Sequence, residues 1–478
     1  MDRANFSDRK YDVIVYGATG DTGSACVRLL YHFADKFNIK SWTMCCRNLQ
    51  KLENTVLGPL QLASPTGFKW TGKPIQADSD NIQSLVNMCK QTRVVIACAG
   101  PYACYGEKVI AACIQGKTNY VDVTGETDWV NNMRRFYGQA ASDAGVSIVS
   151  FGGYDSVPSD ISTWMLGDAL RAQNDPPSVV ETYVTTEAAG GGAMPTGTIK
   201  TVLRMVNKFR YRYSFGLLGE APEKAEAKVK ELKSTSTRSH PSRRDIIERT
   251  KRDISNNNAK FKSKILTGEN AIENAAHIMG RINTAVVHET AVMEGVDDFQ
   301  YFERSIQGGR KAWELHKSGA KPKANDGDIG NSIGYMTILK AIPMALTPWF
   351  DDWVMSQVKQ ANALGSSQSD SLNLVQRLMN EGKMTGYCSM TGFALSKSGK
   401  LFAKSTFETN WEAGIGTTMM CACAIANVLA NSDTNRAGFG TPVLACGGNK
   451  LRGALKDAGV NIDCVVNPIE RSIVESKL

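Results

Sequence analysis

Strand-like and helix-like segments alternate along roughly the first third of the chain. The segments between the strands carry apolar residues at helical spacing. The strand segments read YDVIVYG, SWTMCCR, KPIQADSD, TRVVIACAG, TNYVDVTG and VSIVSFGG. Since repeated strand–helix–strand units give parallel strands with helices on both faces, the pattern predicts an α/β fold with a Rossmann-type doubly wound parallel sheet over residues 1–165.

The alternation ends near Ser178. A strand-like VVETYVTTEA meets the glycine-rich turn GGGAMPTGT, and a basic stretch over residues 221–264 reads as an exposed insertion. We therefore predict a second, α+β domain over residues 166–420 that binds the substrate and would hold any homodimer contact. The C-terminal segment, residues 421–478, reads as helices and a strand that pack back on the body.

Positive charge is concentrated in the insertion. It holds about thirteen Lys and Arg against about six Asp and Glu, so it supplies most of the formal net charge of +8. We predict no nucleic-acid partner and a solvated basic face, with peripheral contact to acidic lipid as the alternative. The longest apolar run, residues 332–354, is broken by Lys340, Pro343 and Pro348, which favours a buried helix or pocket wall over a membrane span.

Cysteine spacing and the chain ends bear on the compartment. None of the 12 cysteines lies in a C-x-x-C pair, so we predict reduced, structural thiols and no metal site. The N-terminal MDRANFSDRK lacks the apolar core of a secretory signal. The last residues, Ser476, Lys477 and Leu478, match the S-K-L signal that the peroxisomal import receptor reads. We therefore expect a peroxisome, or a peroxisome of the glycosome type.

A glycine-rich loop follows the first strand segment and opens the first helical one. In dinucleotide-binding folds such glycines allow a sharp turn, a close backbone approach to a pyrophosphate, and tight packing of helix on strand. The helix N-terminus then directs N–H groups and its positive dipole end at the anion. The loop residues predicted to bind the cofactor are Gly17, Thr19, Gly20, Asp21, Thr22 and Gly23.

The second strand segment indicates which dinucleotide binds. It ends in Arg47, with Lys51 one turn later, where an NAD site would carry an acidic residue for the ribose 2′-hydroxyl. A guanidinium suits a 2′-phosphate through charge-assisted hydrogen bonds. We therefore predict NADP(H), bound in part by Arg47 and Lys51.

Other strand ends should line the same cofactor, because ligands of doubly wound sheets bind beyond the carboxyl ends of the strands. We place Asp78 near the adenine, and we place the residues after the fourth strand segment near the nicotinamide ribose. Those residues are Ala99, Gly100, Pro101 and Tyr102. After the sixth segment, Pro158 can begin a helix with Ser156 or Val157 at its cap and Asp160 in its first turn.

Taken together, the strand-end motifs resemble the saccharopine dehydrogenase-like oxidoreductases, the group that includes the trans-acting enoyl reductases of lipid synthesis. The matching motifs are GATGDTG (17–23), CRNLQKL (46–52), AGPYACYGEKVIAAC (99–113), YVDVTGE (120–126) and GGYDSVPSD (152–160). The resemblance implies an NADP-type Rossmann domain, a second domain over the nicotinamide, and reduction of a C=C or C=N bond. Tyr105 and Glu107 occupy a stretch without histidine, so the amino-acid substrates of true saccharopine-forming enzymes are not carried over.

These inferences give two main hypotheses and a weaker third. The first is an NADP(H)-dependent reductase of a lipid-derived or other apolar small molecule, with Tyr102 or Tyr154 stabilising a developing enolate and Asp155 orienting or relaying a proton. For each of these residues, packing a loop or capping a helix is the alternative role. The second hypothesis is a non-catalytic cofactor-binding protein that associates with lipid or a membrane surface through the basic insertion and the apolar run. The third is an imine reductase that acts on an amino-acid conjugate.

Overall fold

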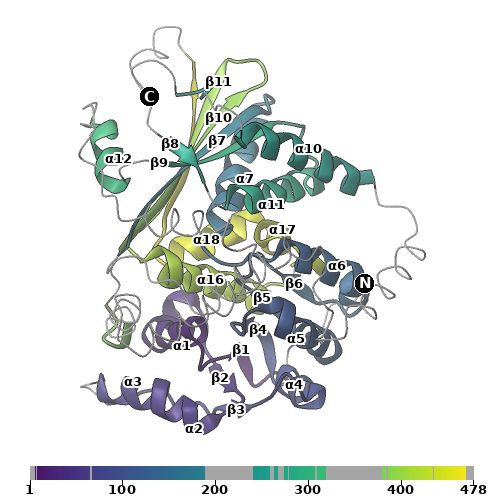
Figure 1. Cartoon of the computed structure of the whole chain (residues 1–478), viewed down its shortest axis with the longest axis vertical. Coiled ribbons are helices and arrows are strands. Elements are labelled where there is room, and N and C mark those ends of the chain that lie inside the picture. Colours follow the sequence, from purple (N-terminus) through teal and green to yellow (C-terminus); the bar gives the residue numbers. More distant parts are fainter. Residues whose placement is uncertain are drawn as a thin grey trace, which may run out of the picture.

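A parallel sheet and a mixed sheet form the two halves of the molecule, the lower and the upper half in Figure 1. The computed structural model describes residues 6, 8–64, 67–188, 241–258, 263–266, 274–277, 279–306, 309–318, 379–383, 386–433 and 435–469. The apolar run 332–354, the first part of the basic insertion and the tail Ser476, Lys477 and Leu478 lie outside these residues.

The first sheet is parallel throughout, with the strand order β12-β6-β5-β4-β1-β2-β3. Its strands are β1 (Tyr11–Tyr16), β2 (Trp42–Cys46), β3 (Ile75–Gln76), β4 (Thr92–Ala97), β5 (Asn119–Asp122), β6 (Ser147–Val149) and β12 (Gly438–Gly440). Because β1 lies between β2 and β4, the order reverses there and the strand ends open a crevice on that side. The predicted α/β class with a Rossmann-type sheet is confirmed.

Helices cover both faces of this sheet. Apolar residues of α1 and α16 pack on one face, and those of α4, α5 and α6 pack on the other. These helices and their short neighbours are α1 (Asp21–Phe33), α2 (Leu49–Leu52), α3 (Gly58–Leu62), α4 (Ile82–Cys89), α5 (Tyr102–Gly116), α6 (Thr127–Asp143) and α16 (Thr418–Asn431). A 3-10 turn over Ala34–Phe37 follows α1, and Asn38, whose backbone is left-handed (φ 49°), ends this turn.

The second sheet is mixed, with the order β13-β11-β10-β7-β9-β8, in which only β7 and β9 are parallel. Its strands are β7 (Pro177–Ala188), β8 (Asn274–Ala276), β9 (Gln300–Ile306), β10 (Gly386–Ser396), β11 (Leu401–Thr409) and β13 (Asn461–Pro468). The remaining helices of the described chain are α7 (Val157–Arg171), α10 (Pro241–Asn258), α11 (Gly280–Met293), α12 (Gly309–Lys317), α17 (Pro442–Cys446) and α18 (Gly448–Asp457). The C-terminal segment returns to both sheets, since β12 pairs with β6 and β13 pairs with β11.

The apolar helix α16 belongs to the core. Together with the turn before it, Ala413–Asn431 is the one stretch of the described chain whose length and mean hydropathy (1.6) would allow it to cross a membrane. However, 83% of its apolar window is buried, against α1 and the strands β1, β4 and β5. Each large apolar side chain buried in this way contributes about 1.5–3 kcal/mol, so tertiary packing accounts for this apolar helix.

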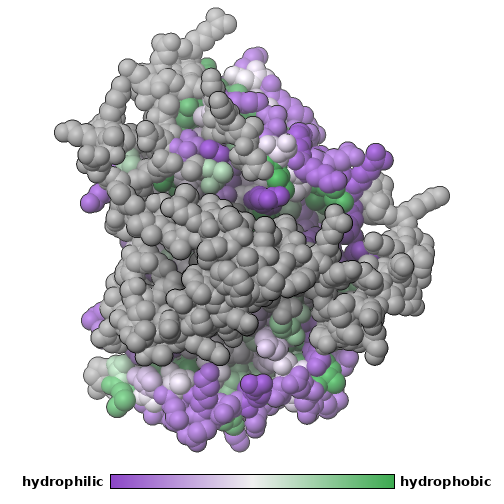
Figure 2. All heavy atoms as spheres, in the orientation of Figure 1, coloured by the Kyte–Doolittle hydropathy of each residue, from purple (hydrophilic) through white to green (hydrophobic). Residues whose placement is uncertain are grey.

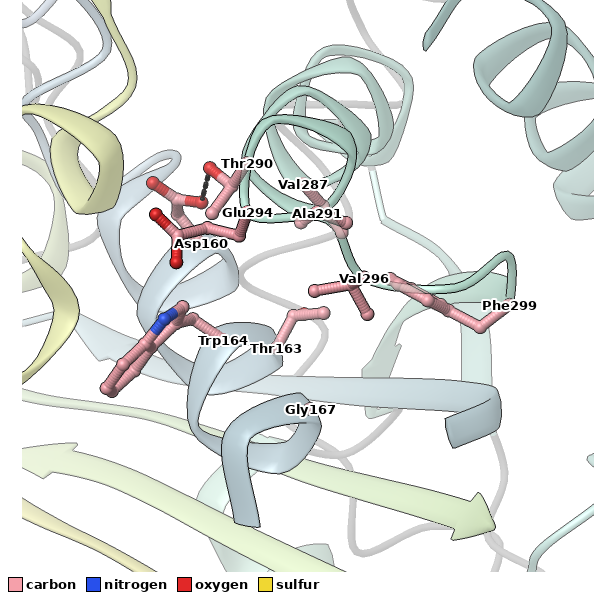
Figure 3. Close-up of a pocket in the computed structure, with 10 residues that line it drawn as sticks. All are labelled: Asp160, Thr163, Trp164, Gly167, Val287, Thr290, Ala291, Glu294, Val296 and Phe299. Atoms are coloured by element: carbon pink, nitrogen blue, oxygen red, sulfur yellow. Dashed lines mark hydrogen bonds between the residues drawn. The ribbon is translucent and has the colours of Figure 1, made fainter. Parts of the chain in front are cut away.

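Helix α7 links the two halves, and Asp160 in its first turn is the centre of that link. The carboxylate accepts hydrogen bonds from the Thr290 hydroxyl of α11 (2.5 Å) and from the Val443 N–H of α17 (3.0 Å). Figure 3 shows Asp160 and Thr290 at one end of a small cavity between α7 and α11. The cavity has room for about one water molecule and none for a substrate.

We expect Asp160 to make stability depend on pH. Burial raises the pKa of Asp160 from 3.8 to about 7, against the hydrogen bonds that lower it. The folded state therefore holds this proton more tightly than the unfolded state, and the associated stability is present below pH 3.8 and lost as the pH rises to about 7. Urea unfolding should show the free energy of unfolding of wild type, relative to Asp160→Asn, falling between pH 4 and 7 by at most about 1.4 kcal/mol per pH unit. A gap that grows with pH would contradict this account.

Candidate functional site

Two of the three loop glycines are required by the fold itself. Gly17 has a left-handed backbone (φ +83°), and a Cβ there would lie 2.9 Å from the Ala99 backbone nitrogen. A Cβ on Gly23 would lie 2.2 Å from the Gly17 carbonyl oxygen, because α1 packs directly on the end of β1. Any side chain at either position would therefore force the loop or the helix to move.

Gly20 is different, because no contact within the described part of the chain requires a glycine there. Its backbone is extended (φ −83°, ψ 168°), a conformation open to any residue. A Cβ there would meet only the Gly17 carbonyl oxygen, at 3.4 Å. The missing side chain leaves open space in front of the N-terminus of α1, and a ligand that approaches the backbone closely would explain it.

The N-cap residue of α1, Gly20, has no side chain to cap the helix, whereas a side chain accepts from the first N–H groups of each of the helices that begin beside β2 to β4. Asn48 caps α2 and Asn81 caps α4. The carboxylate of Glu126 takes the N–H groups of Tyr102 (2.9 Å) and Ala103 (3.1 Å) at the start of α5. Since that carboxylate would repel a phosphate, α1 is the helix of this edge that suits an anion.

The predicted 2′-phosphate residues lie next to this loop. Arg47 directly follows β2, and Lys51 lies on α2, with both side chains exposed. The Arg47 carbonyl accepts a hydrogen bond from the Gln76 amide at 3.0 Å, which ties the backbone of this turn to β3. No salt bridge to Arg47 or Lys51 occurs within the described part of the chain, so both cations can face a ligand phosphate.

The end of β3 carries Asp78, the residue predicted near the adenine. Asp78 accepts a hydrogen bond from the Asp80 N–H (3.0 Å), and its own N–H donates to the Ser84 hydroxyl (3.0 Å). Tyr16, at the end of β1, has a raised pKa because it is buried, with the charge of Asp78 adding to the rise. The structure thus brings Asp78 to the same edge of the sheet as the glycine loop, at the end of a strand two places away from β1.

The residues after β4 lie opposite the glycine loop. Ala99 contacts Gly17, as described above, and the Gly100–Pro101 peptide is cis. The hydroxyl of Tyr102 donates to the Ala97 carbonyl at 2.9 Å, and the ring is 8% exposed beside Trp129. Burial raises the pKa of Tyr102 well above its ordinary value. This geometry supports the alternative role of Tyr102, in which its hydroxyl packs the loop in place.

Tyr154 follows β6, and its hydroxyl differs from that of Tyr102 in its hydrogen bonding. Tyr154 is 9% exposed, and its buried hydroxyl oxygen has no hydrogen-bond partner within the described chain. A buried hydroxyl without a partner costs about 1–3 kcal/mol. A ligand oxygen would supply the missing partner, so the geometry keeps Tyr154 as a candidate donor.

Asp155, the next residue, reaches solvent while protein atoms crowd its other sides. Desolvation raises the pKa of its carboxyl, His277 opposes the rise, and the charges of Glu303 and Glu412 add to it. A carboxyl with a raised pKa at the carboxyl end of a strand suits proton transfer.

A buried polar network, which sequence reasoning missed, joins Asp155 to the second sheet. The Asn283 amide on α11 donates to the Asp155 carbonyl (2.6 Å) and to the Glu303 carboxylate on β9 (2.8 Å). Ser156 donates to the Asn283 side-chain oxygen (2.8 Å), and Tyr301 donates to Glu303 (2.6 Å). Asn283 and Glu303 are at most 1% exposed. Asn283, Tyr301 and Glu303 belong to no motif, so only the tertiary structure reveals their part in this network.

His277 lies at the edge of this network, between β8 and α11. Its Nε2 is 3.7 Å from a Glu303 carboxylate oxygen, and its Nδ1 is 2.7 Å from the Ser305 hydroxyl. Its backbone N–H donates to the Glu303 carbonyl at 3.2 Å. The pairing of β8 with β9 therefore fixes this imidazole beside Glu303.

Known proteins are similar to part of the chain. Residues 13–149 match the family described as saccharopine dehydrogenase NADP binding domain. A lipid droplet localized protein of Caenorhabditis elegans is 32% identical over 225 residues, covering 47% of this chain and 49% of that protein. The human saccharopine dehydrogenase-like oxidoreductase is 30% identical over 200 residues, covering 41% and 46%. A trans-acting enoyl reductase of Mycobacterium bovis is 31% identical over 160 residues, covering 34% and 36%.

These matches confirm the predicted resemblance to the saccharopine dehydrogenase-like oxidoreductases and, through the matched domain, the predicted cofactor class NADP(H). The chain spans about half or less of the length of the curated relatives it matches. The family match ends at Val149, so it includes the glycine loop and Arg47 but stops before Tyr154 and Asp155.

Proposed function

We propose that this chain, whose residues 13–149 form an NADP-binding domain of the saccharopine dehydrogenase type, is an NADP(H)-dependent oxidoreductase. The observation that carries the proposal is the open space at Gly20, the N-cap residue of α1. There the backbone N–H groups of Asp21 and Thr22 would hold the pyrophosphate, with Gly17, Thr19 and Gly23 shaping the loop around it. Arg47 and Lys51 would hold the 2′-phosphate.

The remaining cofactor contacts follow the strand ends. We assign Asp78 to the adenine side, and Ala99, Gly100, Pro101 and Tyr102 to the nicotinamide ribose. When bound, NADPH supplies a hydride, and the protein supplies binding, orientation and electrostatics. The order of the strands supports this assignment, because β3 and β4 lie on opposite sides of β1, where the strand order reverses.

We propose a C=C or C=N bond of a lipid-derived or otherwise apolar small molecule as the acceptor of the hydride. The name of the mycobacterial relative, an enoyl reductase, supports the C=C bond. The Tyr154 hydroxyl, which has no partner within the described chain, would donate a hydrogen bond to the substrate oxygen, and Asp155 would donate the proton. Tyr102 would hold the end of β4 in place.

Association with lipid is a further part of the proposal, supported by the name of the C. elegans relative. Helix α10 makes up most of the described part of the basic insertion. It supports lipid association less than the composition of the insertion suggests, because three of its arginines form ion pairs with acidic side chains. The pairs are Arg244–Glu248, Arg249–Asp245, Arg249–Asp298, Arg252–Asp253 and Arg252–Asp298. The described surface around α10 in Figure 2 is mainly hydrophilic. Import into peroxisomes through Ser476, Lys477 and Leu478 stays a prediction, as does a homodimer.

Arg47→Ala tests the cofactor assignment. We expect the variant to bind NADPH about ten- to hundredfold more weakly while its affinity for NADH is unchanged, because a charge-assisted contact to the 2′-phosphate contributes about 1.5–3 kcal/mol. Titration of each dinucleotide, followed by nicotinamide fluorescence, gives both affinities.

Arg135→Ala, which removes an exposed arginine of α6, is the matched control and should bind both dinucleotides as wild type does. Equal binding of NADPH and NADH by wild type would contradict the role of Arg47. Absence of binding to either would overturn the proposed function, and tight NADPH binding without turnover of any unsaturated acceptor would favour the non-catalytic alternative.

A further inference from the structure

The turn after β6 carries both proposed donors, and the chain enters it in an uncommon backbone conformation. Phe151, three residues before Tyr154, has a left-handed backbone (φ 63°) although its side chain is a bulky aromatic ring. Such a residue keeps this conformation only where the surrounding structure imposes it, and residues of this kind are concentrated at functional sites. Contacts from outside the turn must therefore fix the backbone that presents Tyr154 and Asp155.

We propose that Asn283 is a positioning residue of the reductase site. Its side chain clamps the peptide between Asp155 and Ser156, and it thereby sets where the Tyr154 hydroxyl and the Asp155 carboxyl lie relative to a substrate. This inference rests on the proposed function. It assigns a role to a residue on α11, outside the sequence motifs and outside the family match over residues 13–149.

One side chain of α11 holds two consecutive residues of the turn. Asn283 Nδ2 donates to the Asp155 carbonyl at 2.6 Å, and the Ser156 hydroxyl donates to Asn283 Oδ1 at 2.8 Å. On the other flank, the Tyr154 N–H donates to the Thr418 hydroxyl of α16 at 3.3 Å. Each of the three residues from Tyr154 to Ser156 is therefore tied to a helix that lies far away in the sequence.

The buried carboxylate of Glu303 sets the orientation of the Asn283 amide. The nitrogen and the oxygen of an asparagine amide are told apart by their partners, and a carboxylate can only accept. Glu303 Oε1 lies 2.8 Å from Asn283 Nδ2, while Oε2 accepts from the Tyr301 and Ser159 hydroxyls at 2.6 and 3.1 Å. The amide nitrogen therefore faces Glu303, and its second N–H is directed at the Asp155 carbonyl.

Burial makes this clamp rigid and leaves the donors open to a ligand. Asn283 is fully buried, and Ser156 and Glu303 are 1% exposed, so water cannot readily replace their hydrogen bonds. Helix α11 packs on α7, the helix that follows the turn (Figure 3). By contrast, the Tyr154 hydroxyl has no partner within the described chain, and Asp155 is exposed. The protein thus fixes the backbone of the turn and keeps these two side chains available.

Hydrogen exchange tests the clamp without a substrate. The reporters are the N–H groups of Ser156 and Val157, which donate to the Gly153 carbonyl at 3.2 and 2.9 Å. We expect Asn283→Ala to speed their exchange at least about tenfold, because the loss of buried hydrogen bonds loosens the turn locally. Asn435→Ala is the matched control, since Asn435 is also buried but its amide donates to three backbone carbonyls at the end of α16. Unchanged exchange in Asn283→Ala would overturn the proposal.

Steady-state kinetics separates positioning from a purely structural role. The probes are NADPH and a series of trans-2-enoyl-CoA thioesters with short to long acyl chains. We expect Asn283→Ala to lower kcat about 100-fold, because a displacement of about 1 Å at a reacting group has an effect of that size. The Kd for NADPH should stay unchanged, and Asn435→Ala should keep the wild-type kcat at a temperature at which both variants are folded. Wild-type kcat in Asn283→Ala, or a loss of NADPH affinity without a loss of kcat, would overturn the proposal.

The two measurements also distinguish this inference from the proposed function. Wild type that binds NADPH and reduces none of these thioesters would overturn the proposed reductase, and hydrogen exchange alone would then decide whether Asn283 holds the turn. If Asn283→Ala does not fold, Ser156→Ala replaces it in both measurements. That variant removes one of the two contacts of the clamp, so we expect a smaller loss of kcat, about tenfold.

Discussion

Gly20→Asp is expected to keep or raise the stability of the protein and to abolish NADPH binding. Asp is among the best N-cap residues, and its carboxylate would accept from N–H groups of the first turn of α1, which Gly20 cannot cap because it has no side chain. That carboxylate would occupy the place of the pyrophosphate. Two like charges about 4 Å apart repel by about 4 kcal/mol near a protein surface, so we expect at least about 100-fold weaker binding. Thermal unfolding and a fluorescence titration with NADPH measure the two effects.

Gly23→Ala, three residues along the same loop, is the matched control, because it should lower the stability that Gly20→Asp keeps or raises. Its Cβ would lie 2.2 Å from the Gly17 carbonyl oxygen, so the variant should lose about 1–3 kcal/mol of stability or more. The pair of variants separates a glycine that the ligand needs from a glycine that the fold needs. NADPH binding by Gly20→Asp at the wild-type affinity would show that the pyrophosphate does not lie at α1.

Asp253→Ala is expected to cost about 3–5 kcal/mol, the largest loss of stability that we predict for one side chain. Asp253 is fully buried on α10, and its carboxylate takes His288 Nε2 of α11 at 2.8 Å and the Tyr301 N–H at 2.9 Å. Arg252 also donates to it, at 2.8 Å. Removal of the carboxylate would leave the fully buried imidazole and a buried N–H without this partner. Urea unfolding measures the loss, and hydrogen exchange shows whether α10 detaches first.

Arg244→Ala is the control on the same helix. Arg244 pairs with Glu248 one turn away, with both side chains mostly exposed, and such a pair contributes about 0.3–0.5 kcal/mol. A loss below about 1 kcal/mol in Asp253→Ala would mean that α10 is not anchored through this carboxylate. The basic insertion would then have to be considered an independent arm, as the lipid-binding alternative requires.

The local patterns predicted the first sheet well, because a parallel strand buried on both faces and a following amphipathic helix each leave a strong signal. The β1 strand, the glycine loop and α1 are all where YDVIVYGATGDTG places them. The start of α7 was also predicted, with Ser156 at its cap and Pro158 in its first turn. By contrast, β12 was missed, because three residues with two glycines (Gly438–Gly440) become a strand only by pairing with β6.

The sequence by itself determined the class of the fold, the glycine loop after the first strand and the cofactor class NADP(H), since each depends on residues close together in the chain. Tertiary structure decided which glycine is free for a ligand, because the spaces at Gly20 and Gly23 depend on how α1 packs on β1. It also decided that Tyr102 donates to the sheet while the Tyr154 hydroxyl has no partner within the described chain. The Asn283 amide and the Asp155 backbone carbonyl are 128 positions apart, and they form a hydrogen bond only because α11 packs on α7. A contact over such a separation depends on the packing of two helices, and no local pattern in the sequence encodes it.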